Sequence, residues 1–338
     1  MNILIKFINL FSIFFSKYYF TFIDNYNSIK FKSKKYLFEK LNENSEIDTI
    51  KFEKSLSNYF GGGYAKNFAS ARMALYVILK SLNYTNNDNI CVTAFTCSAV
   101  INSIKRLNIK IKYIDIDISN YGTSFYDLKE KVDKNTKAVL AQHTFGFPCE
   151  ILLIKQFCKE KNIILIEDCA LTFGSSINNT KLGTFGDFAI FSFDQTKPFS
   201  TFLGGCLYTK NELHYQKILN ITKENKNLNF KMQKAIFKRI IFNYKFNYPI
   251  ISSKFIFIDL IINILIRKGF IENPYLDSDF FNLIETRYPY PAKYPNFLSS
   301  LGILTLDNFG EISKTRRDNI KYYLIQFSKH SNIIKIND

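Results

Sequence analysis

The feature that most constrains this chain is a repeated alternation of short apolar segments with amphipathic ones between Phe52 and Cys206. The apolar segments are rich in Ile, Val and aromatic residues, which favour strands, and the segments between them show helical spacing of apolar residues. Strands that alternate with helices predict an α/β fold in which helices cover a mostly parallel sheet. The expected strands are Ile90–Phe95, Ile109–Ile116, Lys137–Gln142, Ile163–Ile166 and Phe188–Phe193, and the expected helices are Ser70–Leu82, Ser98–Leu107 and Glu150–Lys161.

Composition narrows the class of protein. The 338 residues are 47% hydrophobic, enough for a sizeable core, and carry a formal net charge of +16. A basic chain can bind nucleic acid, an anionic membrane or an acidic ligand, but the accompanying excess of Ile, Asn, Phe and Tyr favours a coding bias. No zinc-finger spacing and no basic helix with regular base-reading residues supports nucleic acid. The six cysteines form no CxxC pair, so we expect no metal site and reduced, mostly buried thiols in a cytoplasmic protein.

Two charged residues follow predicted strands. Asp168 follows the strand Ile163–Ile166, and Lys197 follows the strand Phe188–Phe193 in the stretch DFAIFSFDQTKPFSTFLGGC. Open α/β sheets bind ligands at the carboxyl ends of their strands, so both side chains are expected at a ligand site. Pyridoxal phosphate (PLP) needs such a pair: an amine that holds it covalently, and a carboxylate that keeps its ring nitrogen protonated. The alternative for Lys197 is a solvated loop lysine.

The stretch from Ile166 to Thr209, IEDCALTFGSSINNTKLGTFGDFAIFSFDQTKPFSTFLGGCLYT, resembles the signature of the DegT/StrS-type sugar-nucleotide aminotransferases. In that family an EDxA block is followed by G-x-x-G-D, an SF strand, the cofactor lysine and a glycine pair. The resemblance covers about residues 50–215 well and 290–325 weakly. The matching residues are Asp168, Ala170, Gly183, Gly186, Asp187, Ser192, Phe193, Lys197, Gly204 and Gly205.

The resemblance implies a fold and an activity. The fold is that of the fold-type-I PLP transferases: a three-layer α/β/α large domain with a mostly parallel sheet, then a small C-terminal domain of which this chain would hold only the start. The implied protein is a homodimeric transaminase with Lys197 and Asp168 as catalytic residues. L-Glutamate is the implied amino donor, and the acceptor is a nucleotide-linked keto-sugar for a surface polysaccharide or O-antigen. The related sugar dehydratases have histidine at the position of Lys197, so the lysine favours a transaminase.

The resemblance also assigns cofactor contacts. Ser70, Ala71 and Arg72 match a loop at a helix start that holds the cofactor phosphate, where the family usually has SGT. The alternative for Ser70 is a simple helix N-cap. Ser192 matches a second phosphate-binding hydroxyl, or is a small polar residue that closes a strand. The full expected set is Ser70, Ala71, Arg72, Cys97, His143, Asp168, Ala170, Ser192 and Lys197.

Three residues depart from the family pattern. Cys97 occupies the position of an aromatic residue that stacks on the cofactor ring, Leu171 that of a common Gln, and Pro291 that of an Asn from the neighbouring subunit. His143 matches a family residue close to the cofactor, but a lone histidine is more often structural. The alternative function is therefore a catalytically degenerate or membrane-associated relative with a binding or structural role.

The regions outside the resemblance are apolar and basic, and residues 24–48 have the composition of a connector. The expected regions are an N-terminal extension over 1–48, a cofactor-binding domain over 49–215, a helical apolar insertion over 216–290 and the start of the small domain over 291–338.

Two segments, residues 1–15 and 231–268, combine basic and apolar side chains, and both are short for a bilayer span. Each is expected either to lie on an anionic membrane surface or to pack on the protein. In the second segment, a helix would gather its lysines on one face beside apolar surface. The lysines are Lys231, Lys234 and Lys238, and the apolar residues are Ile236, Phe237 and Ile240.

Overall fold

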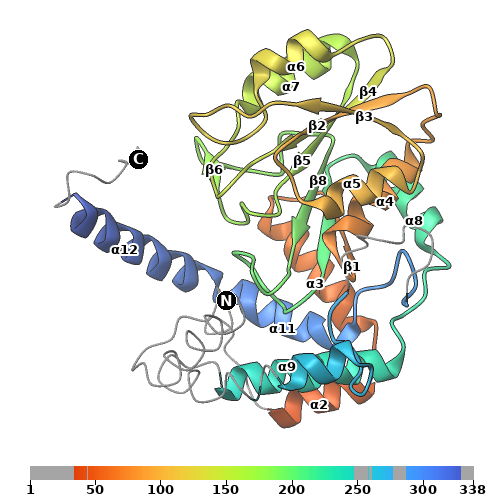
Figure 1. The fold of residues 1–338 in the computed structure, drawn as a ribbon, viewed down its shortest axis with the longest axis vertical. Coiled ribbons are helices and arrows are strands. Elements are labelled where there is room, and N and C mark those ends of the chain that lie inside the picture. Colours follow the sequence, from red (N-terminus) through yellow and green to blue (C-terminus); the bar gives the residue numbers. More distant parts are fainter. Residues whose placement is uncertain (1–33, 44, 247–257, 259–260, 277–286, 329–338) are drawn as a thin grey trace, which may run out of the picture.

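The computed structural model of the protein describes residues 34–43, 45–246, 258, 261–276 and 287–328. Within these residues, a seven-stranded sheet has the order β1-β9-β8-β5-β4-β2-β3, and β6 and β7 form a separate two-stranded sheet (Figure 1). The strands are β1 (Tyr64–Phe68), β2 (Asn89–Thr93), β3 (Lys110–Ile114), β4 (Thr136–Gln142), β5 (Ile164–Asp168), β6 (Ser176–Ile177), β7 (Thr180–Lys181), β8 (Phe188–Ser192) and β9 (Gly205–Thr209).

The large sheet is mostly parallel. Only β9 runs antiparallel to its neighbours, β1 and β8, among the strand pairs of the described residues. Every residue of β2, β8 and β9 is buried, which requires cover on both faces of the sheet. Among the helices, α4 (Ala71–Ser81) lies against β1, β8 and β9, and α7 (Ile151–Lys161) lies against β4 and β5. The predicted α/β fold with a mostly parallel sheet is confirmed.

The expected strands and helices of the alternating region are present, with ends shifted by one or two residues. The sequence pattern does not predict β1 and β9. The first carries Lys66 and Asn67 at the sheet edge, and the second begins at Gly205, so neither looks like a strand locally. The other helices are α2 (Lys34–Glu43), α3 (Ile47–Tyr59), α5 (Ser98–Lys105), α6 (Phe125–Lys131), α8 (Glu212–Thr222), α9 (Phe230–Phe246), α11 (Asn296–Asp307) and α12 (Phe309–Phe327).

The expectation of a connector over residues 24–48 is wrong for its second half. Residues 34–43 form α2, and α3 begins at Ile47. Leu37 and Leu41, four residues apart, are buried on one face of α2. This face packs against α9 and α11, so distant parts of the chain give α2 the partners that a connector would lack.

Helix α9 packs on the protein through its apolar side. Ile236, Phe237 and Ile240 are buried, and the ring centroids of Phe237 and Phe38 on α2 lie 5.6 Å apart. The sequence left two alternatives for this helix, packing on the protein or lying on a membrane surface. For these three residues packing on the protein is confirmed, and the prediction that they face a membrane is wrong. Its lysines Lys231, Lys234 and Lys238 are exposed, as expected for one polar face.

The membrane expectations have a limited structural answer. No helix within the described residues is long and apolar enough to cross a bilayer. Residues 1–15 lie outside the described residues, as do 247–257 of the second segment.

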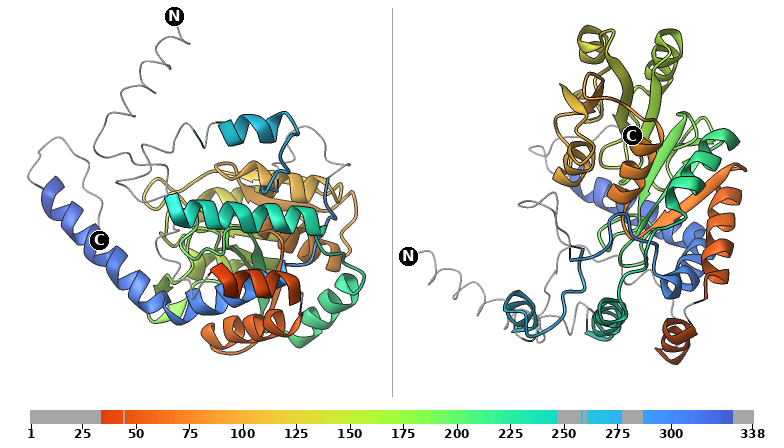
Figure 2. Two further views of the ribbon diagram at one scale, coloured as in Figure 1. Left: turned by 90° about the horizontal axis from the view of Figure 1, so that it is seen from below. Right: turned by 90° about the vertical axis from the view of Figure 1, so that its right-hand side faces the viewer.

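Near the C-terminal end, α11 packs against α2 and α3, and α12 extends away from the sheet (Figure 2). The expected domain boundaries stay a prediction.

Candidate active site

The carboxyl ends of β2, β4, β5 and β8 meet at one edge of the sheet, because these strands are parallel to one another. The register pairs Gln142 of β4 with Asp168 of β5, and Asp168 with Ile190 of β8. The chain leaves β8 after Ser192 and reaches Lys197 in the next loop. The fold therefore carries both predicted charged residues to this edge.

Two adjoining cavities open here, with volumes of about 290 Å³ and 210 Å³. We call them together the sheet-edge site. Cys97, Asp168, Ala170 and Lys197 line both cavities, and Lys197 is the single lysine among the described residues that line them. The larger cavity is also lined by Ser70, Ala71, Arg72, Ser192 and Gly204, and the smaller one by Phe95, His143, Phe145 and Leu171. All nine predicted site residues thus lie at one site, and their individual roles stay predictions.

Asp168 is held in a buried position at the end of β5. The residue is 5% exposed, and its Oδ1 accepts the backbone N–H of Ala170 at 3.0 Å. Burial raises the pKa of this carboxyl above its ordinary range, while the Ala170 N–H and the charge of Lys197 act in the opposite direction. A carboxylate in this setting gains most from a cationic partner in the cavity, because that partner compensates for the lost water.

The start of α4 forms a cradle at the larger cavity. Ser70 has extended backbone (φ −159°, ψ 158°), and its Oγ is buried without a hydrogen-bond partner among the described residues. An unpaired buried hydroxyl is unusual, since it costs about 1–3 kcal/mol. A Cβ on Gly205 would lie 2.4 Å from the Ala71 nitrogen, so only glycine lets β9 approach the first turn of α4 this closely. The N-terminus of a helix with a spare hydroxyl fits an anionic group.

Arg72 connects this cradle to a distant part of the chain. Its Nη2 donates to the carbonyl oxygen of Leu276 at 3.1 Å and to the hydroxyl of Tyr288 at 2.9 Å. Pro274, Tyr275 and Leu276 line the larger cavity, although they belong to the region expected as an insertion. Sequence reasoning missed this wall because a contact between residues so far apart leaves no local pattern. The one feature of the sequence that pointed to this contact was Arg72 itself, a long basic side chain at a position where the family usually has threonine.

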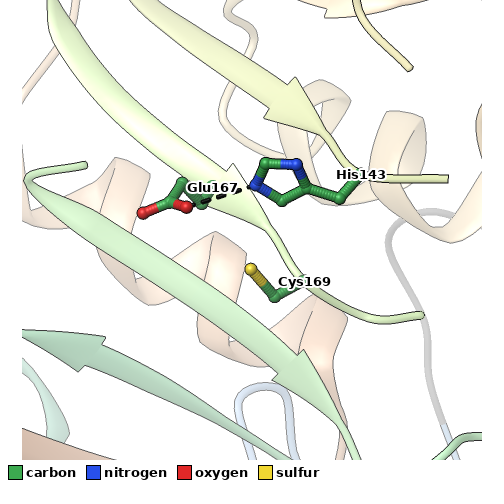
Figure 3. Close-up of side chains that lie close together, drawn as sticks. All are labelled: His143, Glu167 and Cys169. Atoms are coloured by element: carbon green, nitrogen blue, oxygen red, sulfur yellow. Dashed lines mark hydrogen bonds and ion pairs between the residues drawn. The ribbon is translucent and has the colours of Figure 1, made fainter. Parts of the chain in front are cut away.

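Glu167 explains the glycine motif that follows it. Neighbouring residues of a strand point to opposite faces, so Glu167 points away from Asp168. Its Oε1 accepts the backbone N–H groups of Phe185 and Gly186 at 2.7 Å each, and its Oε2 accepts that of Gly183 at 2.8 Å. His143 Nε2 lies 3.2 Å from the same Oε2 (Figure 3). The loop is thereby fixed around a fully buried carboxylate directly beneath the site.

His143 serves this network from a buried position while also reaching the smaller cavity. The backbone N–H of Cys149 points to its Nδ1 at 3.2 Å, so Nδ1 carries a lone pair and Nε2 carries the proton donated to Glu167. Cys169 lies close by, with the ligand atoms of all three side chains within 4.8 Å of one another. Burial raises the pKa of Cys169 to about 11, and both nitrogens of His143 and both oxygens of Glu167 already have hydrogen-bond partners within the protein. We therefore assign this group a supporting role.

The three departures from the family pattern have different positions. Cys97 is exposed and lines both cavities, and Leu171 lines the smaller one. Pro291 is not among the described residues that line either cavity, and its neighbour Ala292 accepts the backbone N–H of Ala69 at 3.2 Å. All six cysteines are free and five are buried, as expected.

The chain is similar in sequence to known proteins. The sequence profile of the DegT/DnrJ/EryC1/StrS aminotransferase family matches residues 42–248. GDP-perosamine synthases of Vibrio cholerae and Escherichia coli O157:H7 are 30% and 32% identical over 174 and 170 residues. These alignments cover 52% and 50% of this chain and 47% of each relative, so the chain spans about half the length of these relatives.

Solved structures show the same fold. PseC of Helicobacter pylori, described as an aminotransferase involved in the biosynthesis of pseudoaminic acid, has a TM-score of 0.68 at 17% identity and covers 94% of this chain and 72% of its own. A GDP-4-keto-6-deoxymannose-3-dehydratase (ColD) has a TM-score of 0.63 at 23% identity, with 88% and 70% covered. Because the family profile matches more than half of the chain, the protein belongs to the DegT/DnrJ/EryC1/StrS aminotransferase family.

Proposed function

We propose that this protein is a PLP-dependent aminotransferase that moves an amino group from L-glutamate to a nucleotide-linked keto-sugar. The observation that carries the proposal is the meeting of Lys197 and the buried Asp168 in one cavity with the Ser70 cradle. Membership of the family and the resemblance to GDP-perosamine synthases support a nucleotide-sugar acceptor. The product would serve a surface polysaccharide such as an O-antigen.

The residues present fit PLP, which when bound supplies a ring that accepts electrons as the donor's Cα–H bond breaks. Ser70 Oγ, the hydroxyl of Ser192 and the first turn of α4 would hold the phosphate, which gives the unpaired Ser70 hydroxyl a partner. Asp168 would accept the hydrogen bond of the protonated ring nitrogen. Lys197 would hold the cofactor covalently through Nζ.

The same two residues would move and hold protons during the reaction. Once the amino donor has displaced Lys197 Nζ from its covalent bond, the freed amine would take a proton from Cα of the donor, and in the second half of the reaction it would deliver one to the former carbonyl carbon of the sugar. Asp168 would stay ionised against the protonated ring nitrogen, because that cation would offset the burial that raises the pKa of this carboxyl.

A second candidate is a catalytically degenerate relative with a binding or structural role. The observation that favours it is Cys97, an exposed thiol at the position where the family stacks an aromatic ring on the cofactor. Loss of stacking would weaken PLP binding without removing Lys197.

We also propose that the protein is a cytoplasmic homodimer with peripheral membrane contact. Family resemblance supports the dimer, together with the exposed apolar residues of α12 such as Ile320 and Tyr323. The exposed lysines of α9 support the membrane contact.

One experiment separates the enzyme from the degenerate relative. The full chain is incubated with PLP, reduced with borohydride and digested, and the pyridoxyl group is located by mass spectrometry. We expect it on Lys197, and we expect Lys197→Ala to abolish labelling while Lys159→Ala on α7 keeps it. Addition of L-glutamate before reduction should convert the cofactor to its amino form and prevent labelling. Labelling of another lysine, or none at saturating PLP, would contradict the proposed enzyme.

A further inference from the structure

A third cavity, of about 480 Å³, lies between α9 and residues 262–274, and none of the predicted site residues lines it. We call it the α9 groove. Its apolar lining includes Phe242, Ile262, Ile266, Phe270 and Ile271. Its basic lining consists of Lys231, Lys234, Lys238 and Arg239, against the single carboxylate of Glu272 among the described lining residues. The groove therefore combines an apolar interior with an excess of positive charge.

The positive charge is available at the groove's rim. Glu272 lies 3.2 Å from Lys231 and so offsets the charge at that end. The guanidinium of Arg239 lies over the ring of Phe242, 5.5 Å from its centroid. Lys234 and Lys238 are exposed one helical turn apart on α9. An anionic partner of the groove would meet these two lysines first.

An exposed apolar ridge lies beside the groove. Residues 261–267 form a helical segment that, among the described residues, lies outermost on this side, next to α9 and away from the sheet (Figure 2). Ile261 is 56% exposed, Ile264 48% and Phe270 79%. Each of these side chains leaves in water an apolar area whose burial would be favourable. A soluble anion would leave this ridge in water, whereas a lipid surface would cover it.

We propose that the α9 groove and this ridge form a docking site for an anionic phospholipid surface, a proposal that rests on the proposed membrane contact. Headgroup phosphates lie against Lys234 and Lys238, and Ile261, Ile264 and Phe270 enter the acyl boundary. Pro274 lines both the groove and the larger cavity of the sheet-edge site. Docking would therefore place the cofactor cavity one side chain away from the membrane-facing groove.

The test is co-sedimentation of the full chain with vesicles of phosphatidylcholine alone or mixed with phosphatidylglycerol, at low and high salt. We expect binding to the anionic vesicles at low salt that weakens at high salt. Lys234→Gln/Lys238→Gln should lower the partition coefficient about 30-fold, which corresponds to ~1 kcal/mol for each basic residue. The control Lys155→Gln/Lys159→Gln removes two exposed lysines with the same spacing on α7, and should bind like the unaltered protein.

A second variant, Ile261→Ser/Ile264→Ser, tests the ridge and should reduce the binding that persists at high salt. Circular dichroism melting checks that each variant is folded. No sedimentation with anionic vesicles overturns the proposal. Undiminished binding of Lys234→Gln/Lys238→Gln also overturns it, and assigns membrane contact to another part of the chain. Calorimetric binding of GDP at these lysines without vesicle binding would make the groove a nucleotide site instead. Pyridoxyl labelling of the same samples reports separately on the proposed aminotransferase.

Discussion

The sheet-edge site and the α9 groove place lysines in opposite settings. Lys197 is half-buried beside a buried carboxylate, above a loop held by the hydrogen bonds of Glu167. Lys234 and Lys238 are exposed on a helix whose other face packs on the protein. In the first region each charge has a fixed position and acts at one atom. In the α9 groove the exposed charges act together on a partner, so a single substitution there should change stability or binding far less than one at the sheet-edge site.

The largest difference between the two regions should appear in stability. Glu167→Ala removes the acceptor of three backbone N–H groups, one buried and two partly buried, and we expect a loss of about 3–5 kcal/mol in the free energy of unfolding. Lys234→Ala, in the groove, should stay within about 0.5 kcal/mol of the unaltered protein. Urea unfolding followed by circular dichroism measures both. Equal midpoints for the two variants would break the comparison.

A smaller effect is expected on activity. Asp168→Asn keeps an oxygen for the Ala170 N–H but removes the charge that would face the ring nitrogen. A charge-assisted hydrogen bond contributes about 1.5–3 kcal/mol, so the rate of the half-reaction with L-glutamate should fall roughly 10- to 150-fold while PLP stays bound. Stopped-flow absorbance of the bound cofactor follows this step. An unchanged rate would remove Asp168 from the catalytic residues.

The smallest predicted effect is a pH dependence of stability in the protein without PLP. Burial raises the pKa of Asp168 above its value in the unfolded chain, about 4. Between the two pKa values the folded state holds a proton that the unfolded state has lost, so this residue destabilises the fold increasingly as pH rises. Asp168→Asn should therefore melt like the unaltered protein near pH 4 and at a higher temperature near pH 7.

Asp88 provides a control of opposite sign. Hydrogen bonds from the backbone and side chain of Thr85 lower the pKa of this exposed carboxyl, so its contribution is present above the unfolded pKa and is lost as pH falls. Asp88→Asn should melt at a lower temperature than the unaltered protein near pH 7 and like it at low pH. If instead Asp168→Asn and the unaltered protein differ in melting temperature by the same amount at every pH, the carboxyl of Asp168 is not desolvated.

The sequence by itself determined the α/β class and the position of the sheet-edge site. Alternating apolar periodicity is a local property, and it predicted five strands of the sheet. Asp168 and Lys197 each follow such a strand, and parallel strands bring their carboxyl ends to one edge whatever the rest of the chain does. The family resemblance also predicted the cradle residues Ser70, Ala71 and Arg72, because they are consecutive in the chain and can be recognised as one short motif.

Only the tertiary structure decided the partners of distant segments. Phe38 meets Phe237, which turned an expected connector into a packed helix and buried the apolar face of α9. Arg72 donates a hydrogen bond to Leu276. Leu276 belongs to the region expected as an insertion, and it forms part of the wall of the larger cavity of the sheet-edge site. Burial and hydrogen bonding depend on what lies nearby in space, and local sequence patterns do not record contacts between residues so far apart in the chain.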